Sequence, residues 1–311
     1  MNELLELCER FKANTIAKAD FIEAMYARHQ RLFDYPPLLG RSTVERLLID
    51  EAGVRAVTRA GLRFLLNPQD RRQPPFEAVN FGSFEGDDEA MLARLVAAGD
   101  RVFDVGANVG WHALHLAHAN STGMVYAFEP VPATYARLEA NVALNDRSNI
   151  ATFPFGLGER EETLTLYLDE SMPVGASAVD HAAEGQAVPV ECRMRSLDAV
   201  VAELGVQPDV VKIDVEGAEL FVLRGAAGAL DSAHPAVFCE LLRKWAASFG
   251  YHPNEAIDLM VSLGYRCYET VGARLEPVAE ITESTVATNF IFLHPERHAP
   301  LLREVGPPDG S

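Results

Sequence analysis

From about residue 87 onward, short apolar segments alternate with segments of helical periodicity, and this alternation restricts the fold more than any other feature of the chain. Consecutive parallel strands need a crossover connection, usually a helix, so the pattern predicts right-handed βαβ units. The predicted fold class is α/β, with a doubly wound, mostly parallel sheet. The predicted strands are RVFDV, MVYAFE, NIATFPFGL, VVKIDV and AVFCEL, with helices over about 111–119 and about 131–145.

Further elements flank this core on both sides. Residues 3–33 carry apolar side chains at roughly helical spacing, and Pro36 and Pro37 are predicted to close that helical stretch. The other predicted elements are a short helix over 43–51, a strand hairpin over 54–66, a loop over 67–75, a helix over 87–99, and strands over 163–168, 188–195 and 287–295.

The charge and cysteine content narrow the classes of partner. The chain has 27 basic and 45 acidic side chains, a formal net charge of −18, which disfavours nucleic acid and anionic membranes as partners. No apolar run reaches bilayer length, and the N-terminus lacks the basic and apolar regions of a secretory signal. Four scattered cysteines form no CxxC pair, so neither zinc nor disulfides are indicated. These features predict a cytoplasmic protein.

The turn after the first predicted strand, VFDVGANVG, lies where open parallel sheets bind ligands. Gly106 and Gly110 carry no side chain that would keep a ligand away from the backbone. The dinucleotide fingerprint GxGxxG is incomplete because its central glycine is missing, and Asp104 would place a negative charge near a pyrophosphate. Both features argue against a nicotinamide cofactor.

S-adenosylmethionine suits the same turn better, because it has an ammonium, a sulfonium and a ribose diol but no phosphate. Asp104 at the end of the first strand could hold the ammonium, directly or through water, and Glu129 at the end of the second could accept hydrogen bonds from both ribose hydroxyls. The alternative is that both are structural carboxylates in helix caps or loops.

Linked motifs in order make the chain resemble the FkbM-type family of S-adenosylmethionine-dependent methyltransferases. They are VFDVGANVGWHALHLA, YAFEPVPATYARLEANVALN, GASAV followed by RSLDAVVAE, and VVKIDVEGAELFVLRGA, with GSFEGDDEAML upstream and LGYRCYE and TNFIFL downstream. The resemblance covers roughly two-thirds of the chain and excludes the first 50 residues. It implies a class I, Rossmann-like methyltransferase domain over 51–300, between an N-terminal helical extension (1–50) and a tail (301–311).

The resemblance also implies a set of cofactor-binding residues. Glu129 would bind the ribose, Phe128 and Pro130 would flank the ribose and adenine, and Gly156 and Leu157 would pack on the adenine ring. The turn residues Asp104, Gly106, Ala107, Asn108 and Gly110 would line the methionine end, with Asp214 beside them.

A second group of carboxylates follows the fourth predicted strand. Alternation along KIDVEGAE places Lys212, Asp214 and Glu216 on one side, and Glu240 ends the next strand. Asp214, Glu216 and Glu240 are the predicted catalytic residues, with Asp214 orienting or deprotonating an acceptor hydroxyl. Two alternatives remain: the three carboxylates could bind Mg²⁺, or they could pair with Lys212 as structure.

The histidines indicate a functional site less clearly than the carboxylates do. His112, His115 and His118 are predicted to lie on a helix surface, with His112 near the cofactor turn. A three-histidine metal site is the alternative, but steps of three drift around the helix and metal-binding pairs on one helix are usually spaced i, i+4. His181 is predicted to be a surface residue in an insertion over 169–187, with action as a base as its alternative.

The resemblance implies an O-methyltransferase acting on a hydroxyl of a small molecule, typically a secondary metabolite or a saccharide. An N-methyltransferase of a related metabolite and a noncatalytic S-adenosylmethionine-binding module are the alternatives. Acceptor specificity is expected in the N-terminal helices and the insertion. The extension has an apolar stripe that must be buried, so it is predicted to cover the acceptor entrance or to form a homodimer.

Overall fold

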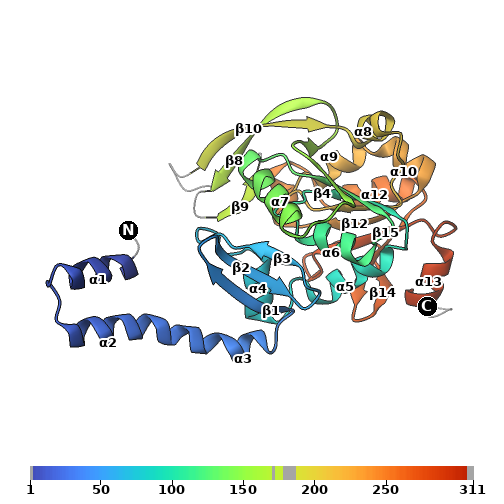
Figure 1. The fold of residues 1–311 in the computed structure, drawn as a ribbon. Helices are drawn as coiled ribbons and strands as arrows, with labels where there is room; N and C mark the ends of the chain where they lie inside the picture. Colours follow the sequence, from blue (N-terminus) through green and yellow to red (C-terminus); the bar gives the residue numbers. More distant parts are fainter. Residues whose placement is uncertain (1–2, 170–171, 178–186, 307–311) are drawn as a thin grey trace.

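The computed structural model describes residues 3–169, 172–177 and 187–306, and its centre is an eight-stranded sheet (Figure 1). Five neighbouring strands are parallel, and the last three are added antiparallel at one edge. The predicted doubly wound, mostly parallel sheet is therefore confirmed. In spatial order the strands are β14 (Arg274–Pro277), β13 (Arg266–Val271), β15 (Asn289–Leu293), β12 (Ala236–Glu240), β11 (Val210–Ile213), β4 (Arg101–Val105), β5 (Met124–Phe128) and β6 (Ile150–Phe153).

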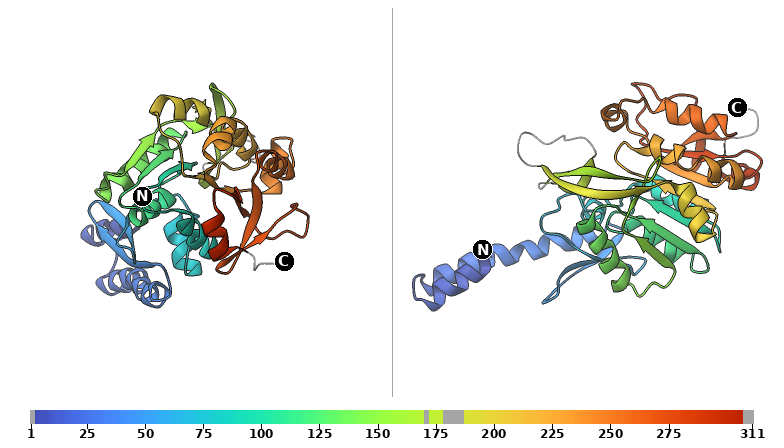
Figure 2. Two further views of the ribbon diagram at one scale, coloured as in Figure 1. Left: turned by 90° about the vertical axis from the view of Figure 1, so that its right-hand side faces the viewer. Right: turned by 90° about the horizontal axis from the view of Figure 1, so that it is seen from above.

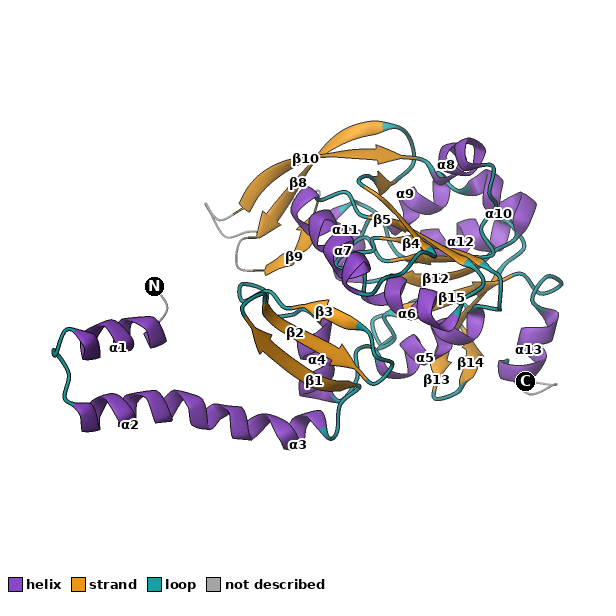
Figure 3. Ribbon diagram, in the orientation of Figure 1, coloured by secondary structure: helices purple, strands orange, loops and turns teal. Residues whose placement is uncertain are grey.

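Helices cover both faces of this sheet, and successive strand residues serve opposite faces (Figure 3). Val102 packs on the face covered by α5 (Gly86–Leu95), α6 (Trp111–Ala119) and α7 (Pro132–Leu144), whereas Phe103 packs on the other. The second face is covered by α8 (Leu197–Leu204), α9 (Glu219–Arg224), α10 (Ala227–Ala233) and α12 (Asn254–Ser262).

The strand order reverses at β4, which has β5 on one side and β11 on the other. The crossovers from β4 and β11 leave the sheet in opposite directions, which opens a crevice beyond the carboxyl ends of these strands. The sequence segments that follow β4, β5, β11 and β12 therefore converge at one edge.

A second sheet stands over this edge and contains the strands predicted over 163–168 and 188–195. Its order is β7 (Gly156–Leu157), β10 (Ala187–Arg195), β8 (Glu162–Asp169) and β9 (Met172–Ser177), with β8 and β10 antiparallel. Most of the predicted insertion, including His181, lies outside the described residues.

The helix predicted over 43–51 is wrong. Val44–Asp50 is strand β1, which pairs with β2 (Gly53–Thr58), and β2 pairs with β3 (Arg63–Leu65) in the hairpin predicted over 54–66. Gly53, the first residue of β2 after the two-residue turn, adopts φ +118. The strand partner supplied by β2 outweighs the local helical pattern.

The N-terminal helices extend away from the body of the protein (Figures 1 and 2). They are α1 (Glu3–Lys12), α2 (Lys18–His29), the 3₁₀ helix η1 (Gln30–Asp34) and α3 (Tyr35–Leu39). Pro36 and Pro37 do not end the helical stretch as predicted, because they occupy the first turn of α3, where proline is tolerated. The helical part of the extension ends at Leu39.

The remaining elements are short. α4 (Pro74–Phe81) starts at the end of the loop predicted over 67–75, α11 (Arg243–Ser248) follows β12, and α13 (Ala299–Val305) occupies the start of the predicted tail. Val305 is fully buried against the central sheet, so this part of the tail is packed. Among the described helices, none combines the length and the apolar character needed to cross a bilayer.

Candidate active site

Two adjoining cavities open at the carboxyl edge of the central sheet. The first lies under the second sheet, and the second lies against α4 and the loop before it. Asn108, Asp214 and Glu216 line both cavities, so the two spaces meet at these three residues.

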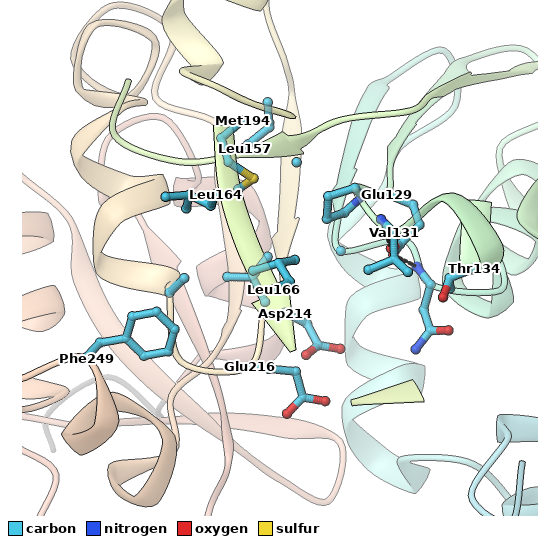
Figure 4. Close-up of a pocket in the computed structure, with 16 residues that line it drawn as sticks. Glu129, Val131, Thr134, Leu157, Leu164, Leu166, Met194, Asp214, Glu216 and Phe249 are labelled. Atoms are coloured by element: carbon cyan, nitrogen blue, oxygen red, sulfur yellow. Dashed lines mark hydrogen bonds between the residues drawn. The ribbon is translucent and has the colours of Figure 1, made fainter. Parts of the chain in front are cut away.

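The first cavity brings together seven of the predicted cofactor-binding residues. Three residues that line it follow the strand ends: Asn108, Glu129 and Asp214. Glu129 and Asp214 are labelled in Figure 4. The full set of predicted residues along the cavity is Gly106, Asn108, Glu129, Pro130, Gly156, Leu157 and Asp214. Asp104, Ala107, Gly110 and Phe128 are not among its lining residues. Ala107, Phe128 and Asp104 are buried beneath the cavity wall.

The glycines of the first turn serve the protein's own packing. Gly106 has φ +78, and a Cβ there would collide with the backbone carbonyl of Asp214, so the turn can pass the end of β11 only with glycine. Gly110 has φ +87, and a Cβ there would lie 2.7 Å from Leu138 Cδ1 of α7. Protein atoms therefore already account for the need for glycine at both positions. Gly106 also lines the first cavity whereas Gly110 does not, and the role of these glycines in admitting a ligand stays a prediction.

A buried lysine lies beneath this turn between two carboxylates. Lys212 Nζ is 3.2 Å from Asp104 Oδ1 and 3.3 Å from Asp214 Oδ2, and it donates to the carbonyl of Gly106 at 3.1 Å. Burial lowers the pKa of Lys212, but the charges of Asp104 and Asp214 outweigh it and the net shift is upward. The Lys212 ammonium is therefore charged and holds the ends of β4 and β11 together.

Asp104 was predicted to hold the cofactor ammonium, and the structure gives it a different neighbour. Its side chain is 0% exposed and faces Lys212. Lys212 lies between Asp104 and Asp214. Of these two carboxylates, Asp214 lines the cavity, and its side chain is 31% exposed. A direct contact between Asp104 and a ligand is therefore unsupported, and its role in ligand binding remains a prediction that would act through Lys212.

Glu129 is held by two backbone amides at the end of β5. Its Oε2 accepts from Asn108 N–H at 3.0 Å, and its Oε1 accepts from Val131 N–H at 2.9 Å. Burial raises the pKa of Glu129 to about 7, although both amides act to lower it. The carboxylate is fixed by the turn after β4 while it lines the cavity, as a ribose-binding group requires.

An apolar wall opposite Glu129 was not predicted. Leu164, Leu166 and Met194 project from β8 and β10, and Phe249 follows α11 (Figure 4). The alternation of Leu164 and Leu166 along β8 was the available signal, because residues two apart share a face. Sequence alone did not show that this face of β8 lies over the carboxyl edge of the central sheet, because tertiary packing determines where the second sheet lies.

The second cavity is lined by carboxylates from four separate parts of the chain. Asp214, Glu216 and Glu240 were predicted, whereas Glu85 and the segment Asp70–Glu77 were not. Arg71 and Arg72 lie at its rim, and the loop that carries them is closed by Gln73 Nε2, which donates to the carbonyl of Asn67 at 2.8 Å. Nothing in the local composition of this loop indicates a site.

Crowding changes the acidity of these carboxyl groups. Burial, with Asp214 and Glu219 nearby, raises the pKa of Glu216 to about 7. Burial and the neighbouring Asp214, Glu216 and Glu219 raise the pKa of Glu240 to about 10. At neutral pH, Glu240 therefore carries a proton and Glu216 exchanges one readily.

Glu219 supports the loop that carries the other two carboxylates. Its side chain is 1% exposed, accepts from the backbone amides of Val215 and Gly217, and accepts from the Tyr251 hydroxyl at 3.2 Å. Glu216 between these amides has φ +54, an unusual conformation for glutamate. Such strain persists only where the surroundings impose it, and Glu219 provides that constraint.

The helix-surface prediction is wrong for His112 and agrees with His118. His112 is 6% exposed, and its Nε2 lies 3.2 Å from Glu85 Oε2. Burial lowers the pKa of His112, but Glu85 outweighs it and the net shift is upward. Burial lowers the pKa of His115 to about 4, whereas His118 is exposed and accepts from Arg147. Within residues 3–169, 172–177 and 187–306, no three His, Cys, Asp or Glu side chains form a metal-ligand set.

A sequence model of the methyltransferase FkbM domain matches residues 104–267, more than half of the chain. The chain belongs to the FkbM-type family of S-adenosylmethionine-dependent methyltransferases.

Curated relatives each match about two-fifths of the chain. Methyltransferase 1 of Beauveria bassiana is 30% identical over 151 residues, covering 43% of this chain and 59% of that protein. Hexuronic acid methyltransferase AglP of Haloferax volcanii is 33% identical over 136 residues, covering 43% and 53%. The 31-O-demethyl-FK506 methyltransferase FkbM of Streptomyces tacrolimicus is 32% identical over 164 residues, covering 42% and 61%. The chain thus spans little more than half the length of these FkbM-type relatives.

The first cavity fits the cofactor of the FkbM-type family. Glu129 offers fixed acceptor oxygens for a diol, and Leu157, Leu164, Leu166 and Met194 form an apolar surface suited to a purine ring. A Cβ at Gly156 would lie 2.7 Å from Met194 Cε, so the Met194 side chain would have to shift to accommodate one.

Glu129→Ala is expected to weaken S-adenosylmethionine binding by about 1.5–3 kcal/mol, because hydrogen bonds to a charged acceptor are lost. Calorimetric titration measures the change. Glu139→Ala, which removes an exposed carboxylate from α7, is the matched control and is expected to bind normally. Equal affinities for Glu129→Ala and wild type would remove Glu129 from the ribose role, and saturable NAD binding would reopen the nicotinamide reading.

Glu240→Gln is expected to stabilise the unliganded protein at pH 8 by about 1–3 kcal/mol. The pKa of Glu240 is raised from 4.5 to about 10 by burial and neighbouring carboxylates, so its favourable contribution is complete below pH 4.5 and is lost as pH rises toward 10. Above pH 4.5 the unfolded chain carries Glu240 ionised, so folding must add a proton to it, and this costs free energy that glutamine does not incur. Denaturant titrations at pH 5 and pH 8 should show a gain that grows with pH, and the exposed Glu280→Gln is the control. A gain independent of pH would contradict the assignment.

Proposed function

We propose that this chain catalyses S-adenosylmethionine-dependent O-methylation of a hydroxyl group on a small molecule. The supporting observation is the junction of the two cavities, where Asp214 and Glu216 line both spaces. A donor bound in the first cavity and an acceptor in the second would meet at these carboxylates. Methyl transfer needs such an in-line arrangement of donor and nucleophile.

The bound cofactor would supply an electrophilic methyl group, and the residues of this chain would perform the remaining tasks. Lys212 fixes Asp214, which orients the acceptor hydroxyl by accepting its hydrogen bond. Glu216 has a raised pKa of about 7, close to the value that suits a general base at neutral pH, so it would take the hydroxyl proton. Glu240 carries a proton at neutral pH and could donate a hydrogen bond to the acceptor.

The proposed acceptor class is a secondary metabolite or a saccharide. AglP is named a hexuronic acid methyltransferase, which supports a saccharide acceptor. FkbM is named a 31-O-demethyl-FK506 methyltransferase, which supports methylation on oxygen. The second cavity has the polar lining that suits such a molecule.

N-methylation of a related metabolite is the second candidate, and the charge of the second cavity favours it. Asp70, Glu77, Glu85 and the three predicted catalytic carboxylates line that cavity, against Arg71 and Arg72. Carboxylates bind ammonium groups, so an amine acceptor would be attracted, although it must lose a proton before it can accept a methyl group.

Mass spectrometry of metabolites from cells lacking the protein tests the proposal. A compound that lacks one methyl group and accumulates should be methylated by the purified protein, and fragmentation should place the new methyl group on oxygen. A methyl group on nitrogen would establish the second candidate. Cofactor binding without any methylated product from the cell's own metabolites would indicate a noncatalytic binding module.

The Mg²⁺ alternative can be separated in the same assay. If Asp214 and Glu216 act directly on the acceptor, EDTA leaves turnover unchanged. Turnover that EDTA abolishes and added Mg²⁺ restores would show that these carboxylates serve a cation instead.

A further inference from the structure

The N-terminal arm, residues 3–39, exposes an unusual share of the protein's apolar surface. Eleven of the sixteen exposed large apolar side chains in the described chain lie on this arm or on the adjacent three-stranded sheet. Elements α2, η1 and α3 contain no buried residue, and α1 buries only Leu7. No described residue before Asp70 lines either cavity, so the structure does not support the predicted role of the extension as a cover for the acceptor entrance.

The arm is nevertheless an ordered pair of helices. Phe11 stacks on Phe21 with ring centroids 4.6 Å apart, and Arg28 Nη2 lies 3.0 Å from Glu3 Oε2, so α1 is tied back along α2. Isolated helices of this length are marginal in water, and most helical stability comes from packing an apolar face. The arm therefore needs a covering surface that its own chain does not provide.

An apolar stripe runs along α2 and η1, and an apolar groove lies at the base of this arm. Ile22, Tyr26 and Phe33 recur at helical spacing and are 54%, 56% and 74% exposed. At the base of the arm, an open groove lies against the sheet formed by β1 and β2, where Ile49 is 66% exposed. The groove is lined by Leu32, Tyr35, Leu39, Leu47, Ile49 and Phe76.

The distribution of net charge along the sequence favours a second copy of the chain as the occupant of this groove. Residues 3–39 contain five basic and six acidic side chains, whereas the rest of the chain contains 22 basic and 39 acidic ones. The arm therefore has a formal net charge of −1, while the remainder carries −17 of the total of −18. Two copies would repel one another through their bodies, but they can approach through their arms with little like-charge repulsion.

We propose that the N-terminal arm dimerises the protein by reciprocal exchange, with the α1–α2 tip of each copy seated in the groove at the base of the other. Elements α2, η1 and α3 together span 22 residues and form a rod roughly 30 Å long. A two-fold axis across the middle of this rod makes two arms antiparallel, which places each tip over the partner's base. The same contact occurs twice, as closed two-fold symmetry requires.

Light scattering coupled to size-exclusion chromatography tests this dimer on the full chain. Wild type is expected at twice 34.0 kDa, whereas Ile22→Glu on the arm and Ile49→Glu in the groove are each expected at 34.0 kDa over the same concentration range. A charge in a buried apolar contact should raise the dissociation constant about 100-fold or more. Val286→Glu alters a residue that is 90% exposed outside both surfaces, and this control should remain dimeric.

Circular dichroism should match wild type for all three variants, because each substitution is at an exposed position. A monomeric wild type at tens of micromolar would overturn the proposal. Dissociation by Ile22→Glu alone, with Ile49→Glu still dimeric, would also overturn it, because the arms would then pair with each other and leave the groove empty.

Discussion

Asp214→Asn is expected to lower kcat for methyl transfer by about 10²–10⁴-fold, with S-adenosylmethionine affinity nearly unchanged. Asp214 lines both cavities and is held 3.3 Å from Lys212 Nζ, so its carboxylate is fixed where donor and acceptor would meet. Asparagine keeps the shape and one acceptor oxygen, but it loses the charge that orients an acceptor hydroxyl and favours removal of its proton. Steady-state kinetics and calorimetry measure the two effects.

Two further variants make the Asp214 result interpretable. Asp231→Asn removes an exposed carboxylate from α10 and should retain wild-type turnover. Glu216→Gln distinguishes the orientation of the acceptor hydroxyl, assigned to Asp214, from the removal of its proton, assigned to Glu216. If Glu216 takes the proton, wild-type kcat rises with pH through an apparent pKa near 7, because only the deprotonated form acts as the base, and this dependence disappears in Glu216→Gln. Near-normal turnover of Asp214→Asn would make Asp214 structural, and the group that orients the acceptor would then be sought at Glu240 or His112.

Lys212→Met is expected to destabilise the protein by about 3–5 kcal/mol, the usual cost of leaving a buried charge without its partner. Lys212 is 2% exposed and contacts Asp104, Asp214 and the Gly106 carbonyl, so methionine would fill similar space while removing all three contacts. The fully buried Asp104 would then have no cation beside it. Denaturant unfolding, monitored with and without S-adenosylmethionine, measures the loss.

The double variant Asp104→Asn/Lys212→Met tests the cause of that loss. If uncompensated charge is responsible, removing the carboxylate should recover a substantial part of the lost stability, which a double-mutant cycle detects as non-additivity. Purely additive losses would mean that Lys212 contributes packing alone. Unchanged stability of Lys212→Met would contradict the structural role assigned to this residue.

The sequence by itself determined the layered core and the principal strand ends. The period-two and helical patterns from residue 87 onward are dictated by burial on both faces of a sheet, so the order of strands and helices could be predicted before any coordinates. Carboxyl ends of parallel strands share one edge, which is why Asn108, Glu129, Asp214 and Glu216 could be placed together in advance.

Only the tertiary structure decided which of these residues reach a cavity. Side-chain alternation does not distinguish a residue that faces solvent from one that faces another strand's side chain, so Asp104 could not be recognised as the buried partner of Lys212. Likewise, the demand for glycine at position 106 comes from the carbonyl of Asp214, more than a hundred residues away. Such contacts depend on the packing of strands that are distant in sequence.

The same distinction explains the errors at the periphery. Val44–Asp50 has a pattern compatible with a short helix, and pairing with β2 makes it a strand. Glu85, the Asp70–Glu77 segment and the apolar face of β8 join the site only because separate elements fold over the sheet edge. Local sequence sets which conformations are favourable, but the free energy of burying and pairing distant segments selects among them.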